Sequence, residues 1–433
     1  MITTAFVKIW EHRVGAVVWD SATGLGYFEY DAAFLTKKLD LSPIKMPIGN
    51  TRKPVFSFTE NKESATFKGL PGLLADVLPD KYGNALINAW LTTQGRPSDS
   101  LNPVELLCFI GTRGVGALEF EPAIPKDKSQ ATSLEISSLV AIAEKIIHNR
   151  KDFSSSLKKN EEKALLDILK IGTSAGGARA KALIAYNPKT KEIRSGQADA
   201  PKGFSHWIIK FDGVTDKQFG ASSGYGRVEM AYYLMAKDAG IEMMESRLLE
   251  ENGRAHFMTK RFDRLPNNEK LHMQSFCALQ HYDFNDITLY SYEQLFETMR
   301  MLSLPYPQAE QLYRRMVFNV LARNCDDHTK NFAFLMDKTG KWQLSPAYDI
   351  CHAYRPESEW VSQQSLSVNG KRKNITRTDL LAVAKQMNIK KADALITEIA
   401  EVVSNWEHYA KKVKVNKKLM KAIGKTLENN NVL

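Results

Sequence analysis

Two carboxylates and an amide suited to catalysis stand close together late in the chain. Asp326 is followed five residues later by Asn331, and Asp349 comes eighteen residues after that. An aspartate can accept the proton of an attacking hydroxyl group, while an asparagine amide and a second aspartate can hold Mg²⁺ against phosphate oxygens. This combination predicts phosphoryl transfer. The alternative is a surface hairpin with solvated acids at its ends.

The sequence between Asn331 and Asp349 predicts the hairpin that would deliver the second aspartate. Residues 332–336 form an apolar run, residues 337–340 (DKTG) form a turn sequence, and a second extended run begins at Trp342. Two apolar runs joined by a short glycine-containing turn are typical of a β-hairpin.

A lysine within an apolar strand is the next candidate. Residues 206–211 (HWIIKF) predict a buried strand that contains Lys210, and Glu229 follows on a helix that begins near Gly226. A buried lysine is costly unless it is paired, and kinases hold the α- and β-phosphates with a strand lysine paired to a helix glutamate. The alternative is an edge-strand lysine whose ammonium group reaches solvent.

A glycine-rich segment precedes this strand. Gly172, Gly176 and Gly177 are separated by small residues, so backbone N–H groups there could close over phosphate oxygens. The spacing fits neither common glycine-rich phosphate motif, and a flexible surface loop is the alternative. Lys181 and a strand at 182–186 follow the glycines.

The elements around these residues predict several domains. A chain of 433 residues is too long for one core. Residues 1–122 predict an antiparallel sheet with helices and contain no catalytic constellation, so we interpret them as a scaffold or docking surface. The supporting patterns are strands at 5–10, 16–20, 24–30 and 111–120, and helices at 70–91 and 101–109. Residues 121–130 are rich in Pro and Lys and predict a linker.

The rest of the chain is mainly helical. Helices are predicted at 133–150, 161–171, 279–322 and 379–426, with a strand and hinge at 255–264. We interpret the lysines of 379–426 as a solvated face. The order of parts, from glycine loop to final aspartate, is that of a two-lobed protein kinase. The motifs H-R-D, D-F-G and A-P-E are absent from the sequence, so a conventional eukaryotic-type kinase is excluded.

Composition and charge restrict the class of protein. The chain is 43% hydrophobic and 25% charged, which is typical of a soluble globular protein. It has no run of eighteen apolar residues and no signal-peptide pattern, so we expect a cytoplasmic protein without membrane contact. The four cysteines form no C-x-x-C pair and predict reduced thiols. The net charge of +10 suits polyanionic partners such as ATP, DNA or tRNA-bound enzymes but selects none.

Five motifs together are characteristic of one family. They are D-D-H-T-K-N at 326–331, S-P-A-Y-D-I at 345–350, S-A-G-G-A-R-A-K at 174–181, I-I-K at 208–210 and K-R-F-D-R at 260–264. Through them the chain resembles, over nearly its whole length, the HipA family of serine/threonine-kinase toxins of bacterial toxin–antitoxin systems. The resemblance implies an α+β, protein-kinase-like two-lobed fold. It would have a β-rich HipA-type subdomain at 1–122, N-lobe elements at 131–265 and a mostly helical C-lobe at 266–433.

The resemblance also implies roles for individual residues. Asp326 would be the catalytic base, supported by His328 and Lys330 on the phosphate side, and Asn331 and Asp349 would hold Mg²⁺. The implied ATP contacts are Ala175, Gly176, Gly177, Ala178, Arg179, Lys181, Lys210, Glu229, Lys260, Arg261, Phe262, His328, Lys330, Asn331, Tyr348 and Asp349. Residues 260–262 would frame the adenine.

One serine would regulate the site. Ser174 precedes the loop glycines and would be the autophosphorylation position. The family's loop often carries Gln-Glu before its lysine, whereas Arg179 and Ala180 stand there in this chain, so details of phosphate binding by the loop can differ.

The implied function is growth arrest by protein phosphorylation. The implied partners are a small helix-turn-helix antitoxin of the HipB kind, operator DNA through that antitoxin, and a translation-related substrate, with glutamyl-tRNA synthetase as the characteristic target. Two alternatives remain open. One is a DNA-associated corepressor subunit with residual kinase activity, and the other is a small-molecule kinase of the aminoglycoside or choline type.

Overall fold

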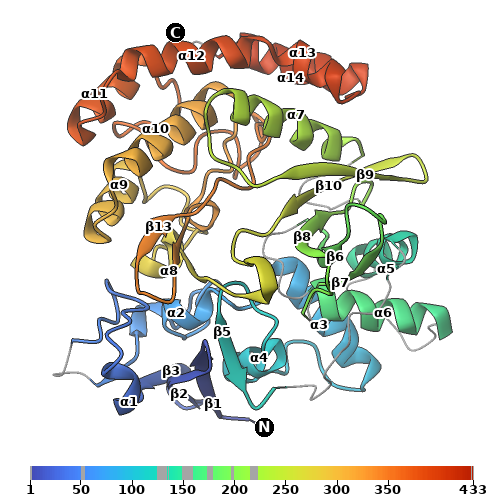
Figure 1. Cartoon of the computed structure of the whole chain (residues 1–433), viewed down its shortest axis with the longest axis vertical. Coiled ribbons are helices and arrows are strands. Elements are labelled where there is room, and N and C mark those ends of the chain that lie inside the picture. Colours follow the sequence, from blue (N-terminus) through green and yellow to red (C-terminus); the bar gives the residue numbers. More distant parts are fainter. Residues whose placement is uncertain are drawn as a thin grey trace.

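The computed structural model describes residues 2–49, 54–123, 134, 136–148, 159–172, 179–196, 199–214, 223–430 and 432. Within these residues, strands form three sheets and helices cover them. The predicted α+β architecture is confirmed. The β-rich N-terminal part lies at one end of the molecule and a layer of C-terminal helices at the other, with the remainder of the two lobes between them (Figure 1).

The N-terminal sheet is antiparallel, with strand order β4-β3-β2-β1-β5. Its strands are β1 (Thr4–Ile9), β2 (His12–Asp20), β3 (Leu25–Tyr30), β4 (Val55–Phe56) and β5 (Leu118–Glu121). Alternate residues of β1, namely Ala5, Val7 and Ile9, are fully buried, as expected for a sheet with one face on the core. The strand predicted at 111–120 is shorter than expected, because residues 111–117 form turns and bends.

The helices predicted at 70–91 and 101–109 are present, but the first is divided into two by residues 76–80, and a short helix at 32–35 was not predicted. The N-terminal helices are α1 (Ala32–Leu35), α2 (Gly72–Ala75), α3 (Lys81–Thr93) and α4 (Pro103–Ile110), with a 3-10 turn η1 (Thr59–Asn61). The Asp80 side chain caps α3 by accepting from the Gly83 N–H at 2.8 Å. Asn102 and Glu105 form a capping box at α4. These caps satisfy backbone donors that the helices leave free.

The second sheet is also antiparallel, with order β7-β6-β8-β10-β9. It consists of β6 (Lys181–Tyr186), β7 (Ile193–Ser195), β8 (Ser205–Lys210), β9 (Ser246–Glu251) and β10 (Arg254–Lys260). Helices α5 (Ile136–His148), α6 (Lys159–Gly172) and α7 (Tyr225–Asp238) accompany it; α6 packs on β6 and α7 packs on β10. Strand β9 was not predicted from the sequence.

The C-terminal lobe combines a small sheet with helices. The sheet has the order β11-β12-β13, from β11 (His272–Ser275), β12 (Ala333–Met336) and β13 (Trp342–Leu344). The helices are α8 (Phe276–Gln280), α9 (Tyr292–Met301), α10 (Tyr306–Leu321), α11 (Arg377–Met387), α12 (Ala392–Ser404), α13 (Trp406–Lys412) and α14 (Lys417–Glu428), with 3-10 turns η2 (Pro266–Asn268) and η3 (Thr329–Asn331). None of the helices among the described residues is long and apolar enough to span a membrane.

The continuous helix predicted over 279–322 is wrong. Ser291 starts a new helix with a capping box to Gln294, and Pro305 starts another. Proline lacks a backbone N–H and favours the first turn of a helix, so the chain breaks before it. The interruption creates the loop 281–291, which lies beside the candidate site.

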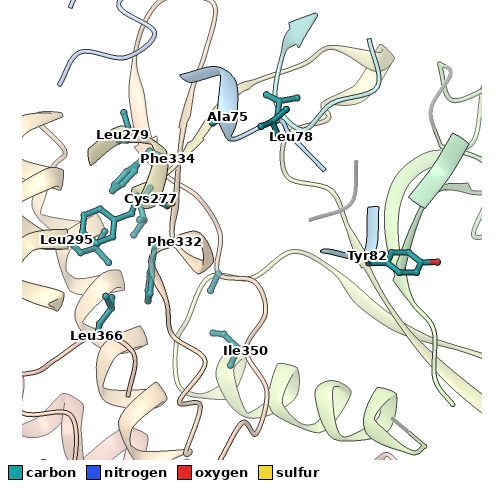
Figure 2. Close-up of a cluster of buried hydrophobic side chains, with 14 of the residues drawn as sticks. Ala75, Leu78, Tyr82, Cys277, Leu279, Leu295, Phe332, Phe334, Ile350 and Leu366 are labelled. Carbon is teal, nitrogen blue, oxygen red and sulfur yellow. The ribbon is translucent and has the colours of Figure 1, made fainter. Parts of the chain in front are cut away.

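The hairpin β12–β13 is anchored in the core. Phe332 and Phe334 are buried together with Leu279, Leu295 and Leu366, and these side chains gather on one side of the cluster in Figure 2. The loop that precedes Phe332 therefore starts from a well-packed base.

Candidate active site

The loop between α10 and β12 brings Asp326 and Asn331 together. The side-chain amide of Asn331 donates a hydrogen bond to the Asp326 carbonyl oxygen at 2.6 Å. This bond closes the loop, with η3 forming its last turn. The Asp326 carboxylate faces outward and keeps 41% of its side-chain surface exposed.

The surroundings of Asp326 increase its affinity for a proton. Desolvation raises its pKa, and the nearby negative charge of Asp349 acts in the same direction, whereas His328, Arg179 and Lys210 oppose the rise. The net shift is upward, and the exposed part of the carboxylate limits its size. His328 Nε2 lies 3.8 Å from an Asp326 carboxylate oxygen, and burial lowers the pKa of this imidazole.

The predicted hairpin is present and delivers Asp349. Strands β12 and β13 pair antiparallel, with Phe334 opposite Leu344, and Gly340 takes the positive φ of 85° that the turn requires. Asp349 follows with φ of 52°, a conformation that is uncommon for a non-glycine residue. Such backbone conformations cluster at functional sites.

Three contacts hold the segment that carries Asp349. The buried guanidinium of Arg315 donates to the Ser345 carbonyl at 2.6 Å. The Ala347 N–H donates to the Glu242 carbonyl at 2.8 Å, and the Tyr348 hydroxyl donates to the Lys330 carbonyl at 2.7 Å. The last bond ties the Asp349 segment to the Asp326 loop.

Lys210 connects the two lobes through its ammonium group. It forms ion pairs with Glu229 of α7 and with Asp349. The Lys210 and Glu229 side chains are only 16% and 5% exposed. The strand lysine and helix glutamate are therefore paired, as the sequence predicted.

These charges stabilise one another. Burial lowers the pKa of Lys210, but Asp349 and Glu229 outweigh it, so the net pKa rises above the ordinary lysine value. Burial raises the pKa of Asp349, but Lys210 and Lys181 outweigh it, so the carboxyl titrates well below its usual range. Asp349 is therefore a carboxylate at neutral pH.

Lys181 reaches the same side of the second sheet as Lys210. The two residues are direct cross-strand partners on β6 and β8, so their side chains project from one face. Arg179 lies two residues earlier, with its guanidinium 4.8 Å from the centre of the Tyr225 ring. Ser174 and the proposed phosphate contacts Ala175, Gly176, Gly177 and Ala178 lie outside the described residues.

The side chains of residues 260–262, the segment proposed to frame the adenine, have different surroundings. Phe262 packs against Tyr348 with ring centres 5.5 Å apart, and Lys260 ends strand β10. Arg261, by contrast, is buried and forms a two-bond ion pair with Asp263 at 2.7 and 2.8 Å. Its side chain has protein partners, so its geometry does not favour the predicted role in ATP binding.

This ion pair belongs to a cluster that binds the N-terminal part. Arg264 also pairs with Asp263, at 2.9 Å, and donates to the carbonyls of Gly114 and Gly116 at 2.9 and 2.8 Å. The Gly116 N–H donates to Asp263 at 2.8 Å. The strand that leads to the hinge is thus attached to the loop before β5.

The N-terminal part also contributes charge near the catalytic loop, which the sequence did not reveal. Lys330 interacts electrostatically with Asp76, Asp80 and Lys68. Its ammonium group lies 5.2 Å from the centre of the Phe284 ring. No local pattern in the sequence marks Asp76 or Asp80 as a neighbour of Lys330.

The surroundings of Asp327 are a second feature of this region that the sequence did not reveal. The Asp327 carboxylate is buried and accepts hydrogen bonds from Tyr292, Gln364 and the Ser365 N–H. Burial raises its pKa to about 7 against these bonds. The only local signal is its position next to Asp326 in the D-D-H string.

The oxygen donors of the site suit Mg²⁺. No cluster of three or more His, Cys, Asp or Glu side chains suited to a metal occurs in the described part of the chain. Mg²⁺ commonly binds proteins through one or two carboxylates and completes its shell with phosphates and water. The Asp349 carboxylate, ionised and 31% exposed, and the amide oxygen of Asn331 fit that pattern.

Comparisons with known proteins agree with this architecture. A family model described as HipA-like C-terminal domain matches residues 173–406, and one described as HipA N-terminal domain matches residues 5–121. A curated protein of Sinorhizobium fredii (strain NBRC 101917 / NGR234), named putative kinase Y4mE, is 25% identical over 154 residues, which is 33% of this chain and 33% of that protein.

A solved structure matches almost the whole chain. It is a chain of the Shewanella oneidensis MR-1 toxin–antitoxin complex of HipA, HipB and operator DNA, with a TM-score of 0.67 and 17% identity over 99% of this chain and 96% of that chain. At this identity the match establishes the shared fold. Because the C-terminal family model alone covers more than half of the sequence, the chain belongs to the HipA family.

Proposed function

We propose that the chain is a Mg²⁺- and ATP-dependent protein serine/threonine kinase and the toxin of a bacterial toxin–antitoxin pair. Its substrate would be a translation-related protein, with glutamyl-tRNA synthetase as the first candidate and other aminoacyl-tRNA synthetases as the next. Phosphorylation of such an enzyme would stop tRNA charging and arrest growth. A HipB-like antitoxin would restrain the chain and link it to operator DNA.

The observation that carries the proposal is the junction of Lys210, Glu229 and Asp349. Three charged groups from a strand, a helix and a loop meet in a mostly buried place. Kinases use these residue types to hold ATP phosphates. Asp326 and Asn331 lie on a loop that Tyr348, the neighbour of Asp349, ties to this junction.

The proposed mechanism assigns one task to each group. Lys210, oriented by Glu229, would bind the α- and β-phosphates, and Asp326 would accept the proton of the substrate hydroxyl as its oxygen attacks the γ-phosphorus. The bond from the γ-phosphorus to the β–γ bridging oxygen breaks in the same step, and ADP leaves with that oxygen. Asn331 and Asp349 would hold Mg²⁺, which when bound neutralises charge on the phosphates. The upward shift in the Asp326 pKa favours a role as base.

Transfer of labelled phosphate tests the proposal. The purified chain would be incubated with Mg²⁺ and γ-labelled ATP, with and without a panel of aminoacyl-tRNA synthetases, beside an Asp326→Asn control. We expect label on the chain and on one synthetase with the wild type, and none with the control. Absence of label with the wild type would favour the corepressor alternative. In parallel reactions supplied with aminoglycosides or choline, label on these molecules alone would favour a small-molecule kinase.

We further propose that Ser174 is phosphorylated by the chain itself and that this modification inhibits the kinase. A phosphate adds about −1.5 to −2 charges at neutral pH, which would repel ATP phosphates from the glycine-rich loop. Mass spectrometry of wild-type and Asp326→Asn protein tests the idea, with phosphate on Ser174 expected only in the wild type. Phosphate in both samples would indicate another kinase, and phosphate on Thr173 would move the site by one residue.

A further inference from the structure

We propose that Asp327 is a positioning residue, which fixes the catalytic loop by tying it to residues 364–365 beyond Asp349. The inference rests on the proposed kinase function for its effect on phosphoryl transfer. It concerns a residue whose carboxylate bonds to Tyr292, Gln364 and Ser365 and not to the proposed ATP-binding charges.

The first support is the set of bonds made by the Asp327 carboxylate. It is 1% exposed and accepts from the Tyr292 hydroxyl at 2.7 Å, the Gln364 side-chain amide at 3.1 Å and the Ser365 N–H at 2.7 Å. Every one of these partners donates to an oxygen of Asp327. The carboxylate thus connects α9, the catalytic loop and the segment after Asp349.

The second support is that the same segment also binds the main chain of the loop. Gln364 donates to the Asn324 carbonyl at 3.3 Å, and the Ser365 hydroxyl donates to the Cys325 carbonyl at 3.1 Å. Together with Asp327, the loop is held at three of the four positions 324–327. At the fourth position, Asp326, the carbonyl accepts from Asn331, while the carboxylate of this proposed base stays 41% exposed.

The third support is a chain of bonds that continues into α10. Tyr292 accepts from the Asn319 side-chain amide at 3.0 Å, and Asn319 accepts from the Asn324 side-chain amide at 2.9 Å. In this chain of bonds, Tyr292 lies on α9, Asn319 lies on α10, and Asn324 lies in the loop. The network is connected, so a change at Tyr292 reaches Asp327 and Asn324 together.

The carboxylates of Asp326 and Asp327 face opposite surroundings, one toward solvent and one into the interior. Asp327 is buried, whereas its neighbour Asp326 is 41% exposed. Anchoring one carboxylate in the interior therefore holds the other toward the substrate. A base that moves by about 1 Å can lose on the order of 10²-fold in rate. Binding of ATP depends on other groups, so turnover is the sensitive quantity.

A pair of tyrosine variants separates positioning from simple stabilisation. Tyr292→Phe removes one donor to Asp327 and keeps the ring, which packs edge-on against Phe332. Tyr313→Phe is the matched control, because Tyr313 is equally buried and its hydroxyl donates to the Leu380 carbonyl at 3.0 Å, outside this network. Tyr292→Phe also loses the bond that its hydroxyl accepts from Asn319, whereas Tyr313→Phe loses one buried hydrogen bond.

We expect Tyr292→Phe to lower kcat about tenfold, the factor set by one weakened anchor, with KM for ATP changed less than about twofold. Tyr313→Phe should keep the wild-type kcat at a temperature where all three proteins are folded. Equal kcat values for the two variants would overturn the inference, because a purely structural bond would affect both alike.

Hydrogen–deuterium exchange gives a readout that needs no kinase activity. We expect peptides covering residues 323–331 and 361–368 to exchange about tenfold faster in both Tyr292→Phe and Asp327→Asn, and unchanged in Tyr313→Phe. In Asp327→Asn the new amide would place donors against donors. Unchanged exchange in both peptides would overturn the tie between the segments.

The two readouts also separate the inference from the proposed function. A wild-type chain that transfers no phosphate contradicts the kinase proposal, and the exchange result then decides alone whether Asp327 fixes the loop. An active wild type with unchanged turnover in Tyr292→Phe leaves the kinase proposal intact and overturns the positioning role.

Discussion

Asp326 and Asp349 carry the same functional group in surroundings that shift their pKa values in opposite directions. Desolvation and the neighbouring carboxylate raise the pKa of Asp326. For Asp349 burial acts upward too, but Lys210 and Lys181 lower the pKa far more. When the pKa values of two carboxyl groups are shifted apart in this way, one group can act as a base while the other stays an anion.

This division predicts different defects for two similar substitutions. Asp326→Asn should lose roughly 10²–10⁴-fold in the transfer rate because the base is missing, while Mg²⁺·ATP still binds. Asp349→Asn should weaken binding of Mg²⁺·ATP as well as transfer, because it removes the metal carboxylate. Calorimetric titration with a non-hydrolysable ATP analogue and Mg²⁺ measures the difference. Equal affinity of the two variants would show that Asp349 is not the metal ligand.

The ion pairs of Lys210 predict non-additive substitutions. Lys210→Ala should strongly impair ATP use, and Glu229→Ala should do so less, because Asp349 still holds the lysine. Once Lys210 is gone, Glu229→Ala should add little, since Glu229 acts through the lysine. Rates of labelled-phosphate transfer for both single variants and the double variant test this coupling.

A surface ion pair provides the control for that experiment. Lys8 and Glu121 form a contact of 3.0 Å on the N-terminal sheet, with half of the Glu121 side chain exposed. Lys8→Ala and Glu121→Ala should leave transfer unchanged, because exposed pairs contribute little. Purely additive losses at Lys210 and Glu229 would mean that the lysine works without its glutamate.

At the scale of elements, patterns within short windows of the sequence predicted the secondary-structure elements that carry the site residues. The hairpin β12–β13, the strand around Lys210 and the helix carrying Glu229 each have a periodicity or a turn that is visible in a short window. The Lys210–Glu229 pair followed because a buried lysine needs a partner and one helix follows the strand.

The parts that were missed depend on contacts between distant residues. Asp327 meets partners 35 to 38 residues away, and Asp76 accepts two hydrogen bonds from Ser275, 199 residues away. The ATP contact that the family resemblance implies for Arg261 stays a prediction, and the bond from its guanidinium to the Gly114 carbonyl, 147 residues away, was not foreseen. No periodicity in one sequence specifies such pairings.

The buried cluster of Arg261, Asp263 and Arg264 predicts a large loss of stability in Asp263→Asn. Two guanidinium groups share this carboxylate, and removing one partner of a buried ion pair typically costs about 3–5 kcal/mol. Chemical denaturation at neutral pH measures the loss. Asp393→Asn, which breaks an exposed pair with Arg377, should cost at most about 1 kcal/mol.

The pH range of the Asp263 effect follows from its charge partners. Burial raises the pKa of Asp263, but Arg261 and Arg264 outweigh it, so the folded-state pKa lies below the ordinary value of 3.8. The stabilisation is therefore complete above the ordinary value and is lost as the pH falls through the folded-state pKa. A difference between wild type and variant that shrinks between pH 8 and pH 5 would contradict this assignment.

At the scale of the whole molecule, the N-terminal part is joined to the rest at several junctions, two of which are rich in polar contacts. One is the arginine–aspartate cluster at the hinge. The other surrounds the loop after α8, where Asp283 accepts from Ser64 and from Thr66, and His281 accepts from the Gly72 N–H at 2.9 Å. Figure 1 shows the N-terminal part beneath both lobes. These contacts make it part of the structural support of the site.

His281 makes the second junction sensitive to acid. Burial, together with the charge of Lys45, lowers its pKa to about 3 from an ordinary value of 6.5, and the nitrogen that accepts from Gly72 must be unprotonated. Between these two values the unfolded chain binds a proton that the folded chain does not. Stability is therefore fully present above pH 6.5 and falls as the pH drops toward 3, by about 1.4 kcal/mol per pH unit from this group.

His281→Asn tests this pH dependence, because asparagine tolerates the left-handed backbone of position 281, where φ is 56°. Free energies of unfolding would be measured from pH 7.5 to 4.5 for both proteins. Other buried histidines, such as His272, destabilise the fold in the same direction as the pH falls, so the difference between the two proteins is the informative quantity. We expect the wild type to lose stability more steeply than the variant below pH 6.5. Parallel curves would mean that protonation of His281 does not oppose the docking of the N-terminal part.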